Sequence, residues 1–223
     1  MSHYDDEAEV ENLKRWWNEN WKPLAAGLVL GLAGIFGWQA WQAHRNAEAM
    51  QASQMFDDIK KAVAAGQTSR AREVADKLAA DYADTPYAAQ GALALAGGEA
   101  RDGAWDEAAK RLDWARDHAR DDGLKAVAQL RRARVAWQQG KADDALKLLE
   151  KAPVKSFEAL YRETEGDIRA AKGDRAGART AYSAALTAGV APAAREFVQQ
   201  KLDDLADVAP AAEARPAAAP AKS

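Results

Sequence analysis

Residue types that commonly carry catalysis or bind metals are sparse in this chain of 223 residues. It has no cysteine, and its histidines (His3, His44 and His118) lie far apart without ligand or triad partners at useful spacing. No phosphate-binding glycine loop, zinc-protease motif or serine-hydrolase motif occurs. The sequence therefore predicts neither an enzyme nor a site for a metal or another cofactor.

Adjacent carboxylates are the remaining groups that could act as a general acid and base. They occur at Asp121–Asp122, Asp143–Asp144 and Asp203–Asp204. Each pair falls at the end of an expected helix or on a solvated face, where aspartate commonly caps backbone N–H groups. We interpret these pairs as helix caps and surface charge rather than as a catalytic pair.

A long uncharged run between Lys22 and Arg45 is the first element that positions the rest of the chain. As a helix, Leu24–Trp41 would be roughly 27 Å long, close to the thickness of a bilayer's hydrocarbon core. Tryptophan flanks the run on both sides, as is typical of membrane interfaces: Trp16, Trp17, Trp21, Trp38 and Trp41. We predict a transmembrane helix over residues 23–43, and a buried core helix is the alternative.

The basic residues beside this span predict its orientation. Lys14, Arg15 and Lys22 precede it, whereas Arg45 is the only Lys or Arg in the first fourteen residues after it. This bias predicts a cytoplasmic N-terminus and a domain beyond the inner membrane, in the periplasm. Residues 1–22 would then form a cytoplasmic leader, with an interfacial helix that ends where Pro23 turns the chain into the bilayer. A cleaved signal peptide is the alternative, but the long acidic leader argues against it.

Gly27 and Gly31 form a G-x-x-x-G pair within the predicted span. Small residues at this spacing lie on one face and let two membrane helices approach closely. Ordinary glycine usage in a membrane helix explains the same spacing equally well. The pair is therefore a candidate site for packing against another membrane helix.

A period of 33 to 37 residues organises the remainder of the chain, because Gly66, Gly103, Gly140 and Gly173 recur at these intervals. An alanine follows each glycine five residues later, at Ala71, Ala108, Ala145 and Ala178. The flanking residues are helical in pattern and nearly free of proline. We expect each glycine to form the turn of a helical hairpin, and each alanine to lie where the two helices cross closely.

These hairpins resemble the tetratricopeptide repeat (TPR), although an aromatic residue expected early in the first helix of each repeat is missing. The best copies are Asp102–Ala115, Gln139–Ala152 and Lys172–Leu186. The resemblance implies an all-α fold, with a TPR-like α-solenoid over residues 44–206 following the single transmembrane helix. A last helix over 193–206, with Phe197, Leu202 and Leu205, would cap the stack. Residues 207–223, rich in Ala and Pro, are expected to be a disordered tail.

A solenoid of helix pairs offers a groove lined by the first helix of each pair. In the register of the better repeats, this candidate groove would present Gln90, Leu93, Arg101, Leu130, Arg134, Trp137, Gln138, Leu160, Glu163 and Asp167. Arginine and tryptophan are types that often anchor protein interfaces. Packing of Trp137 between helices is the alternative that we favour for this residue.

The charge balance excludes one class of partner. Formal net charge is −3, and beyond residue 23 acids and bases are equal in number. A balanced domain has no bulk attraction to nucleic acid.

Three segments carry a resemblance to a known family: Leu13–Gln42, Leu124–Leu149 and Lys172–Tyr182. Together they are similar to the YfgM-like ancillary subunits of the SecYEG translocon. The resemblance implies an inner-membrane protein of a Gram-negative bacterium, bound to the Sec channel. It also implies pairing with a membrane-anchored periplasmic chaperone of the parvulin type, and assistance to newly exported client proteins.

The residues alone are also compatible with two other functions. One is a membrane-anchored TPR scaffold for a different envelope complex. The other is a regulator that sequesters a cytoplasmic signalling protein through its leader.

Overall fold

The computed structural model describes residues 3–205, and side chains from residue 9 onward. The predicted tail lies outside the described residues. The chain divides into two compact units, Met1–Gln51 and Ala52–Ser223, which are considered separately below. Every regular element in the described part is a helix, which confirms the predicted all-α class.

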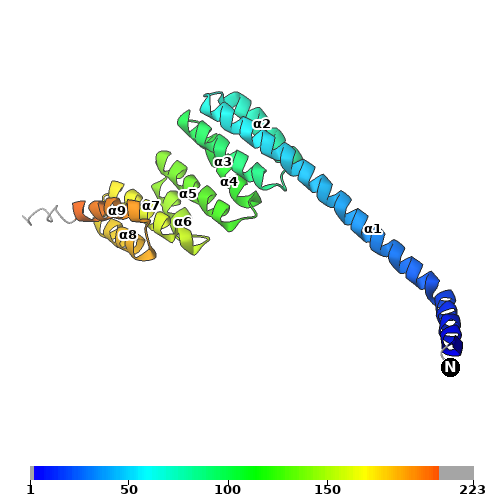
Figure 1. The fold of residues 1–223 in the computed structure, drawn as a ribbon. Coiled ribbons are helices and arrows are strands. Elements are labelled where there is room, and N and C mark those ends of the chain that lie inside the picture. Colours follow the sequence, from blue (N-terminus) through cyan, green and yellow to red (C-terminus); the bar gives the residue numbers. More distant parts are fainter. Residues whose placement is uncertain (1–2, 206–223) are drawn as a thin grey trace, which may run out of the picture. The chain divides into compact units, whose positions relative to one another are not determined.

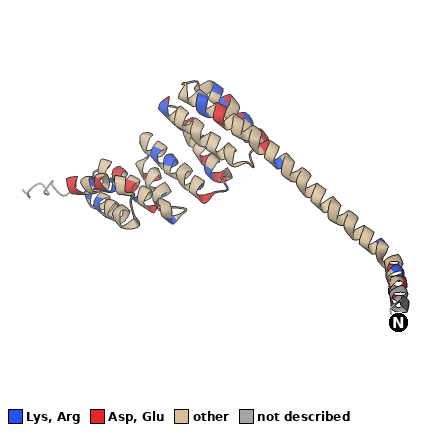
Figure 2. Ribbon diagram, viewed as in Figure 1, with Lys and Arg blue, Asp and Glu red and all other residues tan. Residues whose placement is uncertain are grey.

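The first unit is formed by the N-terminal part of α1 (His3–Ala64). This helix is long and apolar enough to cross a membrane, and none of its most apolar window is buried. Figure 2 shows that its middle part carries no charged residue. Leu28, Leu30 and Trp38 are 65%, 73% and 64% exposed, so the alternative of a buried core helix is wrong.

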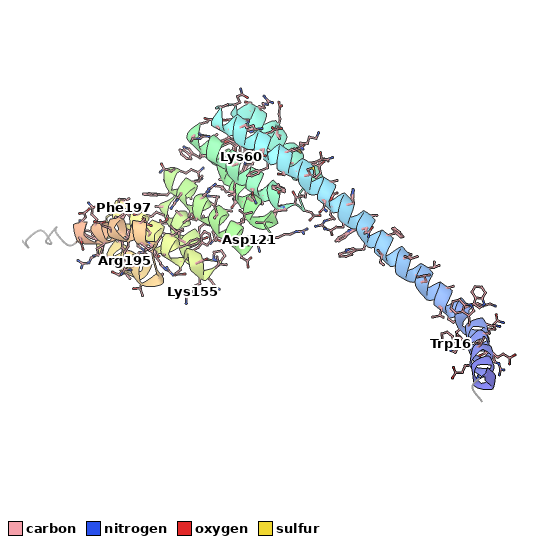
Figure 3. The ribbon with its side chains drawn as sticks, in the orientation of Figure 1. Trp16, Lys60, Asp121, Lys155, Arg195 and Phe197 are labelled. Carbon is pink, nitrogen blue, oxygen red and sulfur yellow. The ribbon has the colours of Figure 1, made fainter. Side chains whose placement is uncertain are left out.

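α1 also corrects one expectation about the leader. Pro23 lies inside the helix and does not separate an interfacial helix from a membrane helix. A proline in a helix interior removes one backbone hydrogen bond and kinks the helix without necessarily ending it. Figure 1 shows a bend in the dark-blue part of α1, and Figure 3 places Trp16 in this part. The domain boundaries at residues 22 and 43 stay predictions.

The second unit is a stack of helical hairpins. It begins with the last part of α1, from Ala52, which packs on the next two helices. The helices that follow are α2 (Thr68–Asp81), α3 (Pro86–Arg101), α4 (Trp105–His118), α5 (Asp122–Gln138), α6 (Ala142–Leu149), α7 (Glu158–Ala171), α8 (Arg175–Ala188) and α9 (Pro192–Asp204). A short 3₁₀ turn, η1 (Lys155–Phe157), precedes α7. From α2 onward each helix contacts the next, and α5 also contacts α3 and α7 (Figure 1). This is the arrangement of a solenoid, whose repeats contact their neighbours.

The four periodic glycines form the hairpin turns, as predicted. Gly103 adopts φ of 77°, a left-handed conformation in which any side chain would be strained. The next backbone N–H, of Ala104, donates to the carbonyl of Glu99 at 2.8 Å, which satisfies a helix-end acceptor. The same pair of features recurs at Gly66, Gly140 and Gly173. The sequence period is therefore a repeated helix C-terminal cap.

The four periodic alanines lie where we expected them, at the crossings within the core. Ala71, Ala108, Ala145 and Ala178 are each 0% exposed. Each belongs to one of four hydrophobic clusters that follow one another along the stack. A methyl side chain at these points lets neighbouring helices pack closely, because a larger group would force them apart.

α9 closes the stack, but through a different residue from the one we expected. Phe197 is 57% exposed (Figure 3), whereas Val198 is 0% exposed and packs with Ala178, Tyr182 and Ala185. Leu202 and Leu205 are partly buried against the same cluster. Val198 and Leu202 share a face because they are four residues apart, and Phe197 lies beside that face. The expectation for Phe197 was therefore wrong, and those for Leu202 and Leu205 are confirmed.

Candidate functional site

A pocket of about 220 Å³ opens between α3, α4 and α5. Its floor consists of apolar side chains that are buried or half-buried: Ala96, Ala100, Trp105, Leu112 and Val135. Its rim consists of exposed residues: Gly97, Arg131, Arg134 and Gln138. We call this feature the α3–α5 pocket. It combines an apolar interior with a basic edge.

The two arginines of the rim hydrogen-bond to uncharged oxygens. Arg131 Nη1 donates to the Leu93 carbonyl at 3.4 Å, and Arg134 Nη2 donates to Thr164 Oγ1 at 3.2 Å. Both acceptors are neutral, and within residues 9–205 neither guanidinium forms an ion pair. By contrast, the neighbouring Arg132 pairs with Asp113 at 3.1 Å. The pocket edge therefore keeps uncompensated positive charge.

Only two residues of the candidate groove, Arg134 and Gln138, line the α3–α5 pocket. Leu93 and Leu130 are 5% and 6% exposed and belong to core clusters, so the expectation that they face a partner was wrong. Trp137 is half-buried and packs on the cluster around Tyr161, which agrees with the alternative that we favoured for it. Helix register had assigned these three residues to the groove, whereas the structure packs them in or against the core clusters.

The other predicted groove residues have separate environments. Gln90 is half-buried on α3, and Leu160 is 42% exposed on α7. Arg101 Nη2 donates to the Val63 carbonyl at 2.9 Å, and this bond joins the end of α3 to the end of α1. None of these three residues lines the pocket. Whether they contact a partner stays a prediction.

Glu163 and Asp167 of α7 are engaged by the capping helix. Lys201 Nζ lies 2.9 Å from Glu163 Oε1 and 2.8 Å from Asp167 Oδ1. Burial alone would lower the pKa of Lys201, but hydrogen bonds to Asp167 and Glu163 outweigh it and raise that pKa. Tyr182 also donates to Asp167 at 2.8 Å. Burial raises the pKa of Tyr182, and the nearby Asp167 carboxylate raises it further. These acids hold α9 in place, and a contact of either one with a partner stays a prediction.

Sequence reasoning missed the other residues of the pocket, among them Gly97, Trp105 and Arg131. Arg131, Arg134 and Gln138 are spaced at three and four residues, so they lie on one helix face. That spacing could have identified Arg131. Trp105 could not be placed from spacing, because it reaches the pocket from the second helix of its hairpin.

Asp121 and Asp143, the first residues of two of the carboxylate pairs, make structural contacts, and the interpretation of Asp203–Asp204 stays a prediction. Asp121 caps α5 by accepting a hydrogen bond from the Leu124 N–H at 2.8 Å (Figure 3 labels this residue). Asp143 pairs with Lys172, and this bond lowers the pKa of the Asp143 carboxyl. Among the residues described, no group of three His, Asp or Glu side chains is arranged to hold a metal ion.

Gly27 and Gly31 lie on one exposed face of α1. Apart from the adjacent residues and the nearby backbone of α1 itself, no atom lies within 4 Å of the position where a Cβ would stand on either residue. Both sites are thus open to close approach by another helix, and this contact stays a prediction.

Comparison with known proteins covers both the span and the helical domain. The tetratricopeptide repeat-like domain family matches residues 14–207. An ancillary SecYEG translocon subunit of Escherichia coli K12 is 35% identical over 92% of this chain and 99% of its own length. The proteins of the same name from Neisseria gonorrhoeae and Haemophilus influenzae are 31% and 29% identical, over 92% and 90% of this chain and 99% and 98% of their own lengths.

These matches agree with the architecture of residues 3–205, in which the apolar part of α1 precedes a solenoid of four hairpins and a cap. They also imply that the chain associates with a membrane. Repeat domains of this type are scaffolds rather than an enzyme family. The chain belongs to the family of ancillary SecYEG translocon subunits, membrane-associated proteins with a tetratricopeptide repeat-like domain.

Proposed function

We propose that this chain is a non-enzymatic ancillary subunit of the SecYEG translocon. Its apolar helix would hold it beside the channel, and its helical domain would receive a partner across the membrane. The observation that carries this proposal is the match over the span and all the repeats to relatives that bear this name. A relationship confined to the repeats would have supported only a scaffold.

The finer part of the proposal is that the helical domain lies in the periplasm. Lys14, Arg15 and Lys22 precede the span, and Arg45 alone follows closely. We expect alkaline phosphatase fused after Leu205 to be active in intact cells, because this enzyme matures only outside the cytoplasm. A cytoplasmic reporter at the same site should be inactive. An active cytoplasmic reporter would contradict the topology.

Contact with the channel should depend on the glycine pair of α1. Replacing both Gly27 and Gly31 with Leu should reduce co-purification of SecY from mild detergent at least about fivefold, because loss of close helix packing costs about 1 kcal/mol. The matched control replaces Val29 and Phe36 with Leu, on the opposite face of the same helix. We expect this control to retain SecY. Equal recovery of SecY with both double variants would show that the glycine face does not make the contact.

The same purification addresses the proposed link to a periplasmic chaperone. A scaffold domain without catalytic groups is suited to holding a membrane-anchored chaperone of the parvulin type near newly exported proteins. The chaperone should remain with the helical domain when the glycine pair is replaced. If deletion of residues 1–22 removed every partner and left the periplasmic domain without one, the regulator hypothesis would replace this proposal.

A further inference from the structure

We infer that the α3–α5 pocket binds an acidic segment of a partner protein by enclosing one bulky apolar side chain between flanking carboxylates. This inference deepens the proposed function and rests on it, since it assumes that the helical domain serves to hold another protein. The pocket is a different surface from the glycine pair of α1, so an experiment can contradict this inference without contradicting the proposed contact with the channel.

The size and lining of the pocket define the apolar part of the ligand. A closed cavity of roughly 150 Å³ takes up a benzene-sized ring, and this pocket offers about 220 Å³. Leu112, which is buried, and Trp105, which is half-buried, belong to its lining, and an indole ring supplies a large apolar contact area. The pocket therefore suits a Phe or Leu side chain.

The rim defines the charge of the ligand. Arg131 and Arg134 are exposed and hydrogen-bond only neutral oxygens, at 3.4 and 3.2 Å, so each can still form a charge-assisted bond. They lie three residues apart, on one face of α5. Carboxylates on either side of the apolar anchor would satisfy both guanidinium groups.

Gly97 lets the ligand reach the pocket. It is exposed on α3, and apart from the adjacent residues and the nearby backbone of α3 no atom lies within 4 Å of its hypothetical Cβ. A Cβ fits there without a clash, and the rest of a Leu side chain would take up space that a ligand needs. This provides a blocking variant that should not disturb the fold.

The tail of the chain itself is a poorer match than a foreign segment. Residues 206–223 contain Asp207 and Glu213, but their largest apolar side chain is Val208. They also carry Arg215 and Lys222, which the basic rim would repel. The composition of the tail lacks the bulky anchor that the pocket can enclose.

A peptide titration tests the inference on the full chain in lipid nanodiscs. The probe is a blocked, labelled peptide with a central Phe and two Glu on each side, followed by fluorescence anisotropy. We expect saturable binding, loss of binding when the four Glu are replaced by Lys, and at least about tenfold weaker binding when the Phe is replaced by Ala. Binding should weaken as salt is raised, because the contacts are partly electrostatic.

Variants of the chain tie this binding to the pocket. Replacing both Arg131 and Arg134 with Gln, or Gly97 with Leu, should weaken binding at least about tenfold. Two controls should bind normally: Arg179→Gln, which removes one charge from an exposed position on α8, and Gly97→Ala, which adds only a methyl group. Circular dichroism should show that each variant remains folded.

Three results would overturn the inference. One is equal binding of the Glu and Lys peptides, and another is binding that survives Gly97→Leu. The third is a several-fold gain in affinity on deleting residues 206–223, which would make the tail the occupant. SecY co-purification should be normal in the arginine double variant. If peptide binding fails while SecY is retained, only the pocket inference is wrong.

Discussion

Replacing Arg72 with Met should lower the free energy of unfolding of the helical domain by about 3 kcal/mol, near the lower end of the range for breaking a buried ion pair. The cost arises at its partner, Glu99, whose side chain is 0% exposed. Arg72 Nε and Nη2 both donate to Glu99 Oε1, at 3.0 and 2.9 Å. The next cation, Arg111, is 4.0 Å away, and Glu99 Oε2 receives no hydrogen bond from the described protein atoms.

Chemical denaturation of a fragment spanning residues 44–207, followed by circular dichroism, measures this effect. Arg70→Met is the matched control, because Arg70 is exposed on the same helix, and it should change stability by less than about 0.5 kcal/mol. The double variant Arg72→Met, Glu99→Met should be more stable than Arg72→Met alone, since it no longer buries an unpaired charge. If Arg72→Met were as stable as Arg70→Met, Arg111 or solvent would be sufficient to stabilise the charge of Glu99.

The repeat architecture could be predicted because its signals are local. A glycine in the left-handed conformation and an alanine five residues later are both set by the geometry of one hairpin turn. Gly103 with Ala108, and Gly140 with Ala145, therefore kept their roles in the structure. The apolar stretch of α1 was equally local, because its length and composition are properties of one run.

The pocket could be predicted only in part, because it depends on packing between hairpins. Helices that contact neighbours on two sides bury more than one face, so a residue's register does not tell which face is exposed. Leu93 and Leu130 were assigned to the groove on register but pack inside the core, at 5% and 6% exposure. Arg134 and Gln138 were assigned correctly to an exposed face, whereas Trp105 reaches the same pocket from a second helix.

Gly166 shows a close contact between two helices that sequence periodicity did not indicate. It is buried on α7, and a Cβ there would stand 2.5 Å from Cδ1 and Cε1 of Tyr182 on α8. Real Cβ atoms do not approach ring carbons so closely, so the tyrosine would have to move. Tyr182 is only 3% exposed and also donates to Asp167, which binds Lys201 of the capping helix. A displaced ring would therefore disturb both the core and the attachment of α9.

Gly166→Ala should consequently destabilise the same fragment by about 2–4 kcal/mol, because losing a buried aromatic ring's packing costs about 3–5 kcal/mol and helix propensity returns about 1 kcal/mol. Gly97→Ala is the matched control. It makes the same change in an open helical position and should stabilise the fragment by up to about 1 kcal/mol.

In a Tyr182→Ala background the ring is absent, so Gly166→Ala should become neutral or stabilising. Denaturation midpoints of the unmodified fragment and the four variants, together with hydrogen exchange in α9, separate these cases. Equal effects of Gly166→Ala and Gly97→Ala would contradict this prediction. They would mean that a Cβ at residue 166 lies farther than 2.5 Å from the ring of Tyr182.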